Sequence, residues 1–272
     1  MIRDEYRDEL ITMYHADALD RLQDVLEPVA AFVTDPPYSS GSRTEAGRTS
    51  SGAMVTARRF AEPIELDQMT TPGFVWMMRA IATIARRLLE PGGSFCSFID
   101  WRQWWNLLGA IETAGLRVNG MVVWDKGSPG TGHGFRSQHE LMIHASNGVP
   151  FVADRSTGNV LGFPRVPRGS QLHAAQKPVE LLEAILRVVV PRGGLVVDPF
   201  AGSGTTLVAA KSLGLRAIGF EIDRENFEIA ADRLAGIIRA RDDHMTGQRA
   251  FDLEIETKPK DQQPTNERGI FQ

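Results

Sequence analysis

The sequence predicts an α/β fold, in which helices cover both faces of a mostly parallel β-sheet. Short apolar runs alternate with longer stretches whose apolar residues recur every three or four positions, as in buried strands and amphipathic helices. A glycine-rich segment at 198–206 joins one of these runs to a helix, and an Asp-Pro-Pro-Tyr turn at 35–38 ends another. In open α/β sheets, ligands bind at such carboxyl ends of the strands.

Length and composition limit the class of protein. The chain has 272 residues, of which 42% are hydrophobic, enough for one large domain with a sizeable core. We expect a single domain over residues 1–241, with a loop insertion at 39–62, and a polar, flexible tail at 242–272. No apolar run reaches the length of a membrane span, the charged N-terminus lacks a signal-peptide core, and Cys96 is the single cysteine. We therefore expect a cytoplasmic protein without a membrane partner.

The first half of the chain predicts four strands and three helices. Thr71 and Pro72 mark a helix start, with Thr71 as N-cap and Pro72 at the first helical position, and the prolyl-diglycine at 91–93 ends that helix. In chain order, the expected elements are a strand at 11–16, a helix at 18–26, a strand at 30–34, the helix from Thr71, a strand at 94–99, a helix at 102–114 and a strand at 118–124.

The second half continues the alternation after a glycine-rich loop at 127–134. A strand at 141–145 is expected to run antiparallel to the one before it, which makes it the one reversed strand of the sheet. Residues 147–175 predict loops with room for a short strand. The remaining expected elements are a helix from Pro178 to the stop at 191–194, a strand at 195–198, a helix at 205–213, a strand at 216–222 and a helix at 224–241.

The Asp-Pro-Pro-Tyr segment is a rigid polar turn. Two consecutive prolines remove two backbone donors and cannot continue a strand, so they place a carboxylate, Asp35, and an aromatic ring, Tyr38, at a strand end. On this pattern alone, a turn that merely ends a strand remains an equal alternative.

The glycine-rich segment has the features of a nucleoside site. Gly202 and Gly204 permit a tight turn before a helix N-terminus, and Glu221 ends the next strand, where an acid commonly binds ribose hydroxyls. Leu207 stands where a dinucleotide loop needs its third glycine, and no Gly-Lys-Ser/Thr follows. A cofactor with one nucleoside and a carboxylate fits better, and S-adenosylmethionine is such a molecule.

Together, these motifs resemble those of the amino-group DNA methyltransferases, which methylate adenine N6 or cytosine N4. The Asp-Pro-Pro-Tyr element precedes Asp-Pro-Phe-Ala-Gly-Ser-Gly, an order similar to that of the family's permuted beta group. His173–Pro178 is similar to that group's His-Pro-x-Gln-Lys-Pro signature, with Ala174 in place of proline, and Tyr14–Asp17 resembles the segment that holds the cofactor's adenine. The resemblance covers roughly residues 11–240 and implies a Rossmann-like methyltransferase fold.

The resemblance also implies roles for individual residues. Asp35 and the Pro36 carbonyl would accept hydrogen bonds from the target amine, and Tyr38 would stack on the flipped-out base. Asp17 would contact the adenine of S-adenosylmethionine, Glu221 its ribose, and Lys177 its carboxylate. Asp198, Gly202, Gly204 and Thr205 would lie on its methionine side. Phe200 would pack near the cofactor, and Ser203 of the same loop would also bind it. Simpler alternatives stay open for Lys177 as a solvated helix-start lysine and for Phe200 as core.

The substrate is expected to be double-stranded DNA. In the family, Asp at the first motif position goes more often with adenine, so Asp35 favours N6-adenine, with N4-cytosine as the alternative. A methyltransferase of RNA or protein glutamine, and a nucleotide- or DNA-binding module without catalysis, are the other classes considered. The family also implies a homodimer and a link to restriction–modification.

Charge is unevenly distributed. The formal net charge is −4, yet residues 39–61 carry four arginines against one glutamate, and residues 126–177 carry six basic against two acidic residues. We expect target recognition at about 127–172, with contacts from residues 39–61 as well. The candidate DNA-binding residues are Arg43, Arg136, Arg155, Arg165 and Arg168. Cys and His spacing suggests no metal site, and the Trp101, Trp104 and Trp105 cluster predicts packing or an oligomer surface.

Overall fold

A computed structural model describes residues 4–38, 69–130, 133–167 and 176–236 of the chain. The expected loop insertion at 39–62 and the tail at 242–272 lie outside these residues, as do His173, Ala174, Arg43 and Arg168.

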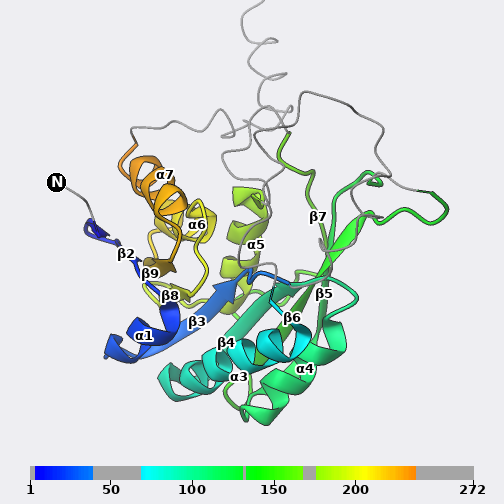
Figure 1. Cartoon of the computed structure of the whole chain (residues 1–272), viewed down its shortest axis with the longest axis horizontal. Coiled ribbons are helices and arrows are strands. Elements are labelled where there is room, and N and C mark those ends of the chain that lie inside the picture. The colour runs from blue at the N-terminus through cyan, green and yellow to red at the C-terminus, as the bar shows by residue number, and fades with distance from the viewer. Residues whose placement is uncertain (1–3, 39–68, 131–132, 168–175, 237–272) are drawn as a thin grey trace, which may run out of the picture.

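A nine-stranded sheet forms the centre of the molecule, with the strand order β1-β2-β9-β8-β3-β4-β6-β5-β7 (Figure 1). The strands span Glu5–Arg7 (β1), Ile11–His15 (β2), Val29–Thr34 (β3), Leu89–Ile99 (β4), Arg117–Asp125 (β5), His139–Ser146 (β6), Val160–Gly162 (β7), Leu195–Asp198 (β8) and Arg216–Glu221 (β9).

The sheet is mostly parallel, as the sequence predicts. Strands β2, β9, β8, β3 and β4 pair in parallel, and β7 pairs in parallel with β5. β6 runs antiparallel to both β4 and β5, which confirms the reversed strand. A second reversed strand, β1, pairs antiparallel with β2. Its three residues are too few to show a period, so sequence patterning did not predict it.

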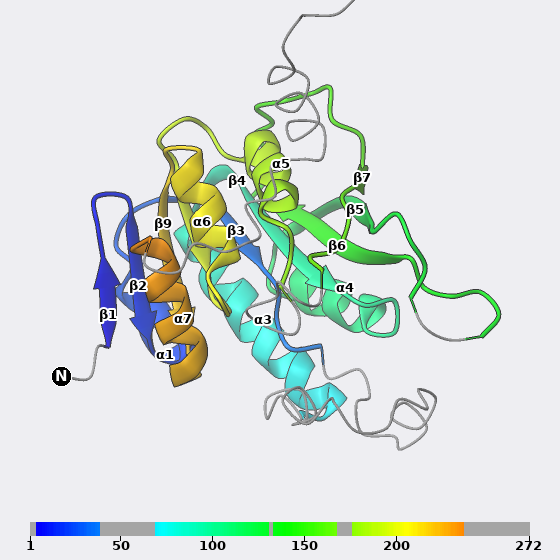
Figure 2. The same cartoon turned by 90° about the horizontal axis from the view of Figure 1, so that it is seen from above.

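Helices cover both faces of the sheet (Figure 2). One face packs against α1 (Ala18–Arg21), the short 3-10 turn Leu22–Asp24, α3 (Thr71–Leu88) and α4 (Trp104–Thr113). The other packs against α5 (Val179–Val189), α6 (Thr205–Ser212) and α7 (Arg224–Leu234). The buried β3 contributes to both cores, because its side chains point alternately to the two faces.

Several predicted boundaries are wrong: among them, α1 ends at Arg21 and is followed by the 3-10 turn, and β6 begins at His139. The N-cap of α3 is Thr70, whose hydroxyl accepts from the Gly73 N–H, so Thr71 is the first helical residue. β4 begins at Leu89, since Gly92 and Gly93 exchange backbone hydrogen bonds with Asn147 at the end of β6. α7 ends at Leu234, several residues before the expected end.

The direction of the strands gathers polar side chains at one edge of the sheet. Asp17, Glu221, Asp198 and Asp35 lie at or just beyond the carboxyl ends of β2, β9, β8 and β3. The reversed β6 starts at this edge, opposite the end of β5, and so brings Glu140 to it. Within the described parts of the chain, no helix is long and apolar enough to cross a membrane.

Candidate active site

Asp198 anchors the glycine loop from inside the protein. Its side chain is buried, and its Oδ1 accepts from the Thr34 hydroxyl at 2.8 Å and from the Phe200 N–H at 3.1 Å. The Thr206 hydroxyl is a further donor. Burial raises the pKa of Asp198 to about 6 in spite of these donors. Asp198 therefore fixes the loop between β8 and α6 and ties it to β3.

Glu221 supports the same loop from the next strand. Its two carboxylate oxygens accept from the Gly202 N–H at 2.7 Å and the Asp223 N–H at 2.8 Å. Burial raises the pKa of Glu221 to about 7, against the effect of both backbone donors. This acid thus sits at the carboxyl end of β9 and contacts the glycine loop directly.

The two glycines of the loop serve different purposes. Both have positive φ, +53° at Gly202 and +78° at Gly204. A Cβ at Gly204 would lie 3.0 Å from the Ala230 Cβ, so glycine allows α7 to pack closely against the loop. A Cβ at Gly202 would meet no atom of the described chain within 4 Å. The Gly202 side of the loop is therefore open to an approaching ligand.

Other predicted cofactor residues surround this loop. Ser203 and Thr205 are buried, and the Ser203 carbonyl and Thr205 hydroxyl both accept from Arg233 at 3.1 Å. Phe200 is half-buried against the α1–α3 core, as the plain-core alternative would have it. Asp17 is exposed and caps α1 through the Leu19 N–H at 2.8 Å. It lies at the same sheet edge as Glu221, because β2 and β9 are adjacent.

Asp35 forms the second part of the site. Its Oδ1 accepts from the Tyr38 hydroxyl, and its Oδ2 accepts from the Lys177 ammonium. Lys177 is buried and lies between three aromatic rings, with its Nζ 5.0 Å from the Phe98 ring centroid. The structure therefore pairs Lys177 with Asp35 and excludes the alternative of a solvated lysine. Pro36 is buried next to them.

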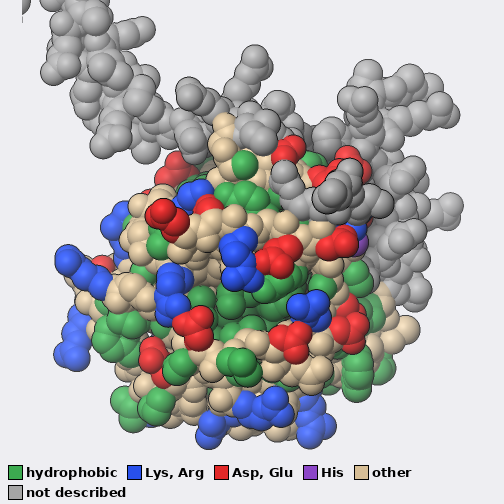
Figure 3. Space-filling model, turned by 90° about the vertical axis from the view of Figure 1, so that its left-hand side faces the viewer, with side chains coloured by type: hydrophobic (Ala, Val, Ile, Leu, Met, Phe, Trp, Pro, Cys, Tyr) green, Lys and Arg blue, Asp and Glu red, His purple; other side chains and the backbone are tan. Residues whose placement is uncertain are grey.

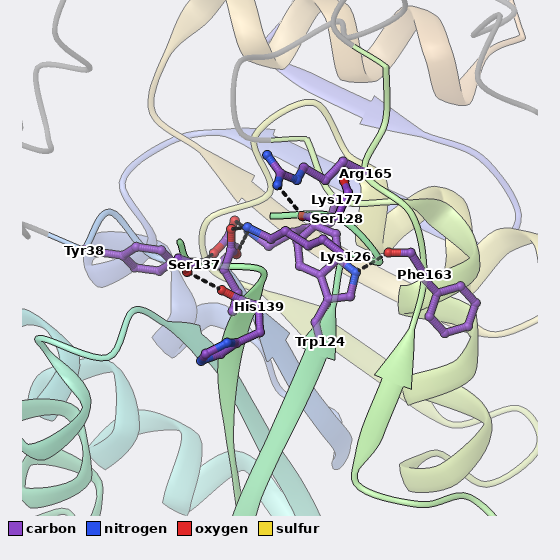
Figure 4. Close-up of polar contacts among 11 residues, drawn as sticks. Tyr38, Trp124, Lys126, Ser128, Ser137, His139, Phe163, Arg165 and Lys177 are labelled. Carbon is purple, nitrogen blue, oxygen red and sulfur yellow. Dashed lines mark hydrogen bonds and ion pairs between the residues drawn. The ribbon is translucent and has the colours of Figure 1, made fainter. Parts of the chain in front are cut away.

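Two residues that sequence reasoning missed complete this cluster. Glu140 forms ion pairs with Lys177, at 3.1 Å, and with Lys126, whose ammonium also lies 4.8 Å from the Trp124 ring centroid. Figure 4 shows Lys126, Lys177 and Trp124 close together at the base of the β5–β6 hairpin. The sequence did contain a signal for Glu140. A strand that runs antiparallel to its neighbour starts at the edge where the neighbour ends, so the residue just before the apolar run at 141–145 lies at the active edge.

The ion pairs decide the charge states in this cluster. Burial alone would raise the pKa of Glu140, but Lys177 and Lys126 hold it at about 2. Burial alone would lower the pKa of Lys177, yet Asp35 and Glu140 raise it. Burial, with the carboxylates of Asp35 and Glu140 nearby, raises the pKa of Tyr38 well above its usual range. At neutral pH, Glu140 and Lys177 are therefore charged and Tyr38 is neutral.

Of the candidate DNA-binding arginines, the structure describes Arg136, Arg155 and Arg165. Arg136 and Arg155 are exposed, whereas Arg165 donates to the Ser128 carbonyl at 2.8 Å and joins the hairpin to the segment after β7 (Figure 4). Trp104 is buried in the α4 core, but Trp101 and Trp105 are largely exposed. Among the residues placed by the structure, no group of three or more His, Cys, Asp or Glu side chains is arranged to hold a metal.

A cavity of about 400 Å³ lies away from this edge, near the amino-terminal ends of β8 and β9. Basic and acidic residues alternate in its lining, and Figure 3 shows the same alternation over this side of the molecule. Arg7, Arg21 and Arg216 pair there with Glu5, Asp24 and Glu27. Its lining carries three arginines against four acidic residues, so the cavity offers no net positive charge to an anionic ligand, and it is separate from the Asp35 cluster.

The site as a whole fits a nucleoside-bearing cofactor beside a polar substrate group. A loop with an open glycine, a helix N-terminus and a buried acid on the adjacent strand form one part. The Thr34–Asp198 hydrogen bond connects it directly to the residue before Asp35. A hydrogen-bonding carboxylate and an aromatic hydroxyl form the other part.

Comparisons of the sequence with a family profile and with related proteins agree on one family. The sequence profile of the N6/N4 DNA methylase family, described as DNA methylase, matches residues 29–156 and 152–232. The Escherichia coli K12 protein YubD is 29% identical over 209 residues, covering 77% of this chain and 83% of that protein. The type II methyltransferase M2.DpnII of Streptococcus pneumoniae is 25% identical over 263 residues, covering 86% of this chain and 93% of that protein.

Solved structures share the fold. The M1.HpyAVI–SAM complex superposes with a TM-score of 0.63 and 23% identity, over 83% of this chain and 100% of that chain. The cytosine-N4-specific PvuII DNA methyltransferase superposes with a TM-score of 0.65 and 18% identity, over 92% and 93% of the two chains. The Rossmann-like methyltransferase fold expected from the sequence is confirmed.

Proposed function

The chain belongs to the N6/N4 DNA methylase family, and from that membership we propose that it transfers a methyl group from S-adenosylmethionine to the exocyclic N6 of adenine in double-stranded DNA. The observation that carries the proposal is the Asp35 carboxylate at the end of β3, one residue from the Thr34 hydroxyl that binds Asp198 of the glycine loop. An amine acceptor and a nucleoside loop thus share one edge of the sheet.

The residues of the glycine loop fit S-adenosylmethionine. Glu221 would accept hydrogen bonds from the ribose hydroxyls, and Asp17, at the end of the adjacent strand, would lie toward the adenine. Gly202, Ser203, Gly204 and Thr205 would hold the methionine portion at the N-terminus of α6, with Asp198 fixing the loop. The bound cofactor supplies an electrophilic methyl group.

Asp35 and Pro36 would activate the target amine. The lone pair of an exocyclic amine is conjugated into its ring, which makes the amine a poor nucleophile. Acceptors aimed at its two hydrogens, the Asp35 carboxylate and the Pro36 carbonyl, favour a tetrahedral nitrogen and stabilise the positive charge that grows on it. The nitrogen must release one proton when it gains the methyl group, and Asp35 is the acceptor placed to hold it. Tyr38, whose ring is half-buried beside Asp35, would stack on the base.

Cytosine N4 is the second candidate target. The PvuII enzyme, which shares the fold, is named as cytosine-N4-specific, and an Asp35 carboxylate can accept a hydrogen bond from either amine. Adenine is favoured because the motif begins with Asp, which in the family goes more often with adenine.

The β5–β6 hairpin is the proposed DNA-recognition element within residues 127–172. It projects from the body of the molecule beyond the active edge (Figure 2). Phe135 and Arg136 are exposed on this hairpin, and Arg165 braces its base. Arg136 and Arg155 suit contacts to phosphate or to guanine, with Arg43 and Arg168 as further candidates. The exposed Trp101 and Trp105 are the proposed surface of a homodimer. The type II relative supports a role in restriction–modification.

Transfer of tritium from labelled S-adenosylmethionine to duplex DNA, RNA and protein, assayed in parallel, tests the proposal. The DNA should come from a host without DNA methyltransferases, so that every target is free. We expect label in duplex DNA. Label in protein or RNA alone would contradict the proposal and favour the alternative substrates.

A further inference from the structure

Four charged side chains from four separate segments meet beside the proposed catalytic carboxylate. Asp35 follows β3, Lys126 follows β5, Glu140 lies near the start of β6, and Lys177 precedes α5. The chain of ion pairs runs from Asp35 to Lys177, then to Glu140, then to Lys126. The Lys177 side chain is only 8% exposed and that of Lys126 14%, so both ammonium groups of these ion pairs lie largely out of bulk water.

Such an arrangement needs a reason, because buried ions are costly. Removing charges from water costs several kcal/mol per ion unless partners compensate. Around the Lys177 ammonium the structure places the Tyr38, Phe98 and Trp124 rings and two carboxylates, those of Asp35 and Glu140. The Asp35–Lys177 pair alone would be neutral, so stability does not require a second acid and a second base here. Glu140 and Lys126 add another buried pair at the same point.

The geometry shows what the second pair does. Lys177 donates to the Asp35 oxygen opposite the one that accepts from Tyr38, so the two donors hold the carboxylate in one orientation. Glu140 shares the same ammonium from the β6 side. Without Glu140, the full charge of Lys177 would fall on Asp35 and compete with the target amine for its oxygens. Lys126 in turn holds Glu140 in place.

We propose that Glu140 and Lys177 are positioning residues for Asp35, which together orient its carboxylate and keep it available to the target amine. This inference rests on the proposed function, in which Asp35 accepts the amine. It differs from the role that the sequence resemblance implies for Lys177, as a ligand of the cofactor carboxylate. It also couples the base of the proposed DNA-recognition hairpin to the reacting carboxylate through Glu140 and Lys126.

Two variants separate these roles. Glu140→Gln keeps the shape of the side chain and one acceptor oxygen, but it removes the negative charge that pairs with Lys177 alongside Asp35. Lys177→Met removes the ammonium at similar length. For each, we would measure the single-turnover rate of methyl transfer to duplex DNA from a methylation-deficient host and the Kd for S-adenosylmethionine. We expect each rate to fall about 10- to 100-fold, as misplacement of a reacting group does, with the cofactor Kd unchanged. Lys177→Arg should recover part of the rate.

The double variant and a remote ion pair provide the controls. Lys177→Met/Glu140→Gln should lose less than the product of the two single losses, because the two residues act as a unit. Lys211→Met removes a more exposed ion pair, with Asp8 at 2.6 Å, between the residues before β2 and the last turn of α6 and outside the Asp35 cluster, and should leave the rate unchanged. If Lys177→Met does not fold, the near-isosteric Glu140→Gln still carries the test.

The possible contradictions are distinct. A weaker cofactor Kd with an unchanged rate at saturating cofactor would make Lys177 a cofactor ligand and overturn the inference. A Glu140→Gln rate equal to that of Lys211→Met would overturn it as well. Absence of transfer to DNA by the unmodified protein, in contrast, would overturn the proposed function itself.

Discussion

The two parts of the candidate site are held together by different forces. The cofactor part, from β8 through α6 to β9, is fixed by short-range hydrogen bonds to backbone N–H groups, as at Asp198 and Glu221. Burial raises the pKa of both acids. The target part is fixed by ion pairs between distant segments, and two lysines lower the pKa of Glu140 to about 2. One part is a local motif, and the other exists only in the folded protein.

This difference has a functional meaning. A loop that binds one invariant cofactor can be encoded in a single strand–loop–helix unit, with Glu221 contributed by the next strand. A carboxylate that must meet a base delivered by DNA is instead connected to the hairpin that would touch the DNA. Changes in the first part should therefore alter cofactor affinity, and changes in the second should alter the rate of transfer.

Asp35→Ala should have the largest effect and separate the two parts most cleanly. Loss of the amine acceptor should reduce the transfer rate by about 100- to 1,000-fold, as removal of one preorganised electrostatic contact does. Cofactor affinity, measured by calorimetry, should persist. Loss of cofactor binding in this variant would place Asp35 in the cofactor part instead.

Gly204→Ala should have the second-largest effect, and it should act on the cofactor part of the site. The substitution combines a positive φ with a Cβ 3.0 Å from the Ala230 Cβ. We expect a loss of unfolding free energy of about 2–4 kcal/mol from strain and overpacking, together with weaker cofactor binding. Gly214→Ala is the matched control, since its φ is +66° and the described chain offers no atom within 4 Å of the new Cβ. Equal losses in both variants would show that the close approach to α7 is unimportant.

Thr34→Val tests the bond that joins the two parts. Its buried hydroxyl donates to Asp198 at 2.8 Å across β3 and β8. Removing one partner of a buried hydrogen bond costs about 1–3 kcal/mol, which chemical denaturation would measure. Thr34→Ser keeps the hydroxyl and should lose less. Little or no loss in Thr34→Val would contradict a stabilising role for this hydrogen bond.

A pH dependence of cofactor affinity should be the smallest effect. Burial raises the pKa of Glu221 from 4.5 to about 7. Ribose hydroxyls donate to the ionised form, so affinity should increase as the pH rises through 7, by up to about tenfold per pH unit on the acidic side. Between pH 4.5 and 7, the folded protein keeps a proton on Glu221 that the unfolded chain releases. The contribution of Glu221 to the free energy of unfolding therefore decreases as the pH rises through this range.

Glu221→Gln should flatten both curves, and Glu225→Gln, at an exposed position on α7, should not. Binding that is equally tight from pH 6 to 8 in the unmodified protein would mean that the charge of Glu221 does not contribute.

The sequence predicts the local features well, for reasons that differ between the two parts. The β8–α6–β9 unit was predictable because its glycines, buried acids and helix start lie within a short stretch. The strand expected at 141–145 is confirmed with its reversed direction, but β6 begins at His139 and so includes Glu140, whose partners were not predicted. The pairing of Lys177 with Asp35 and Glu140 depends on which strands become neighbours in the sheet, and no local pattern encodes that. The early start of β4 depends on pairing with the distant Asn147, whereas β1 pairs with the next strand in the chain but is too short to show a period.

Identification of the methylated nucleoside tests the central claim most directly. The protein would be produced in a host that lacks DNA methyltransferases, and its DNA would be digested and analysed by mass spectrometry, with the Asp35→Ala variant as control. We predict N6-methyladenine in the DNA of cells with the unmodified protein and far less with the variant. N4-methylcytosine in place of N6-methyladenine would contradict the adenine assignment, and unmodified DNA from both would contradict the account of the site.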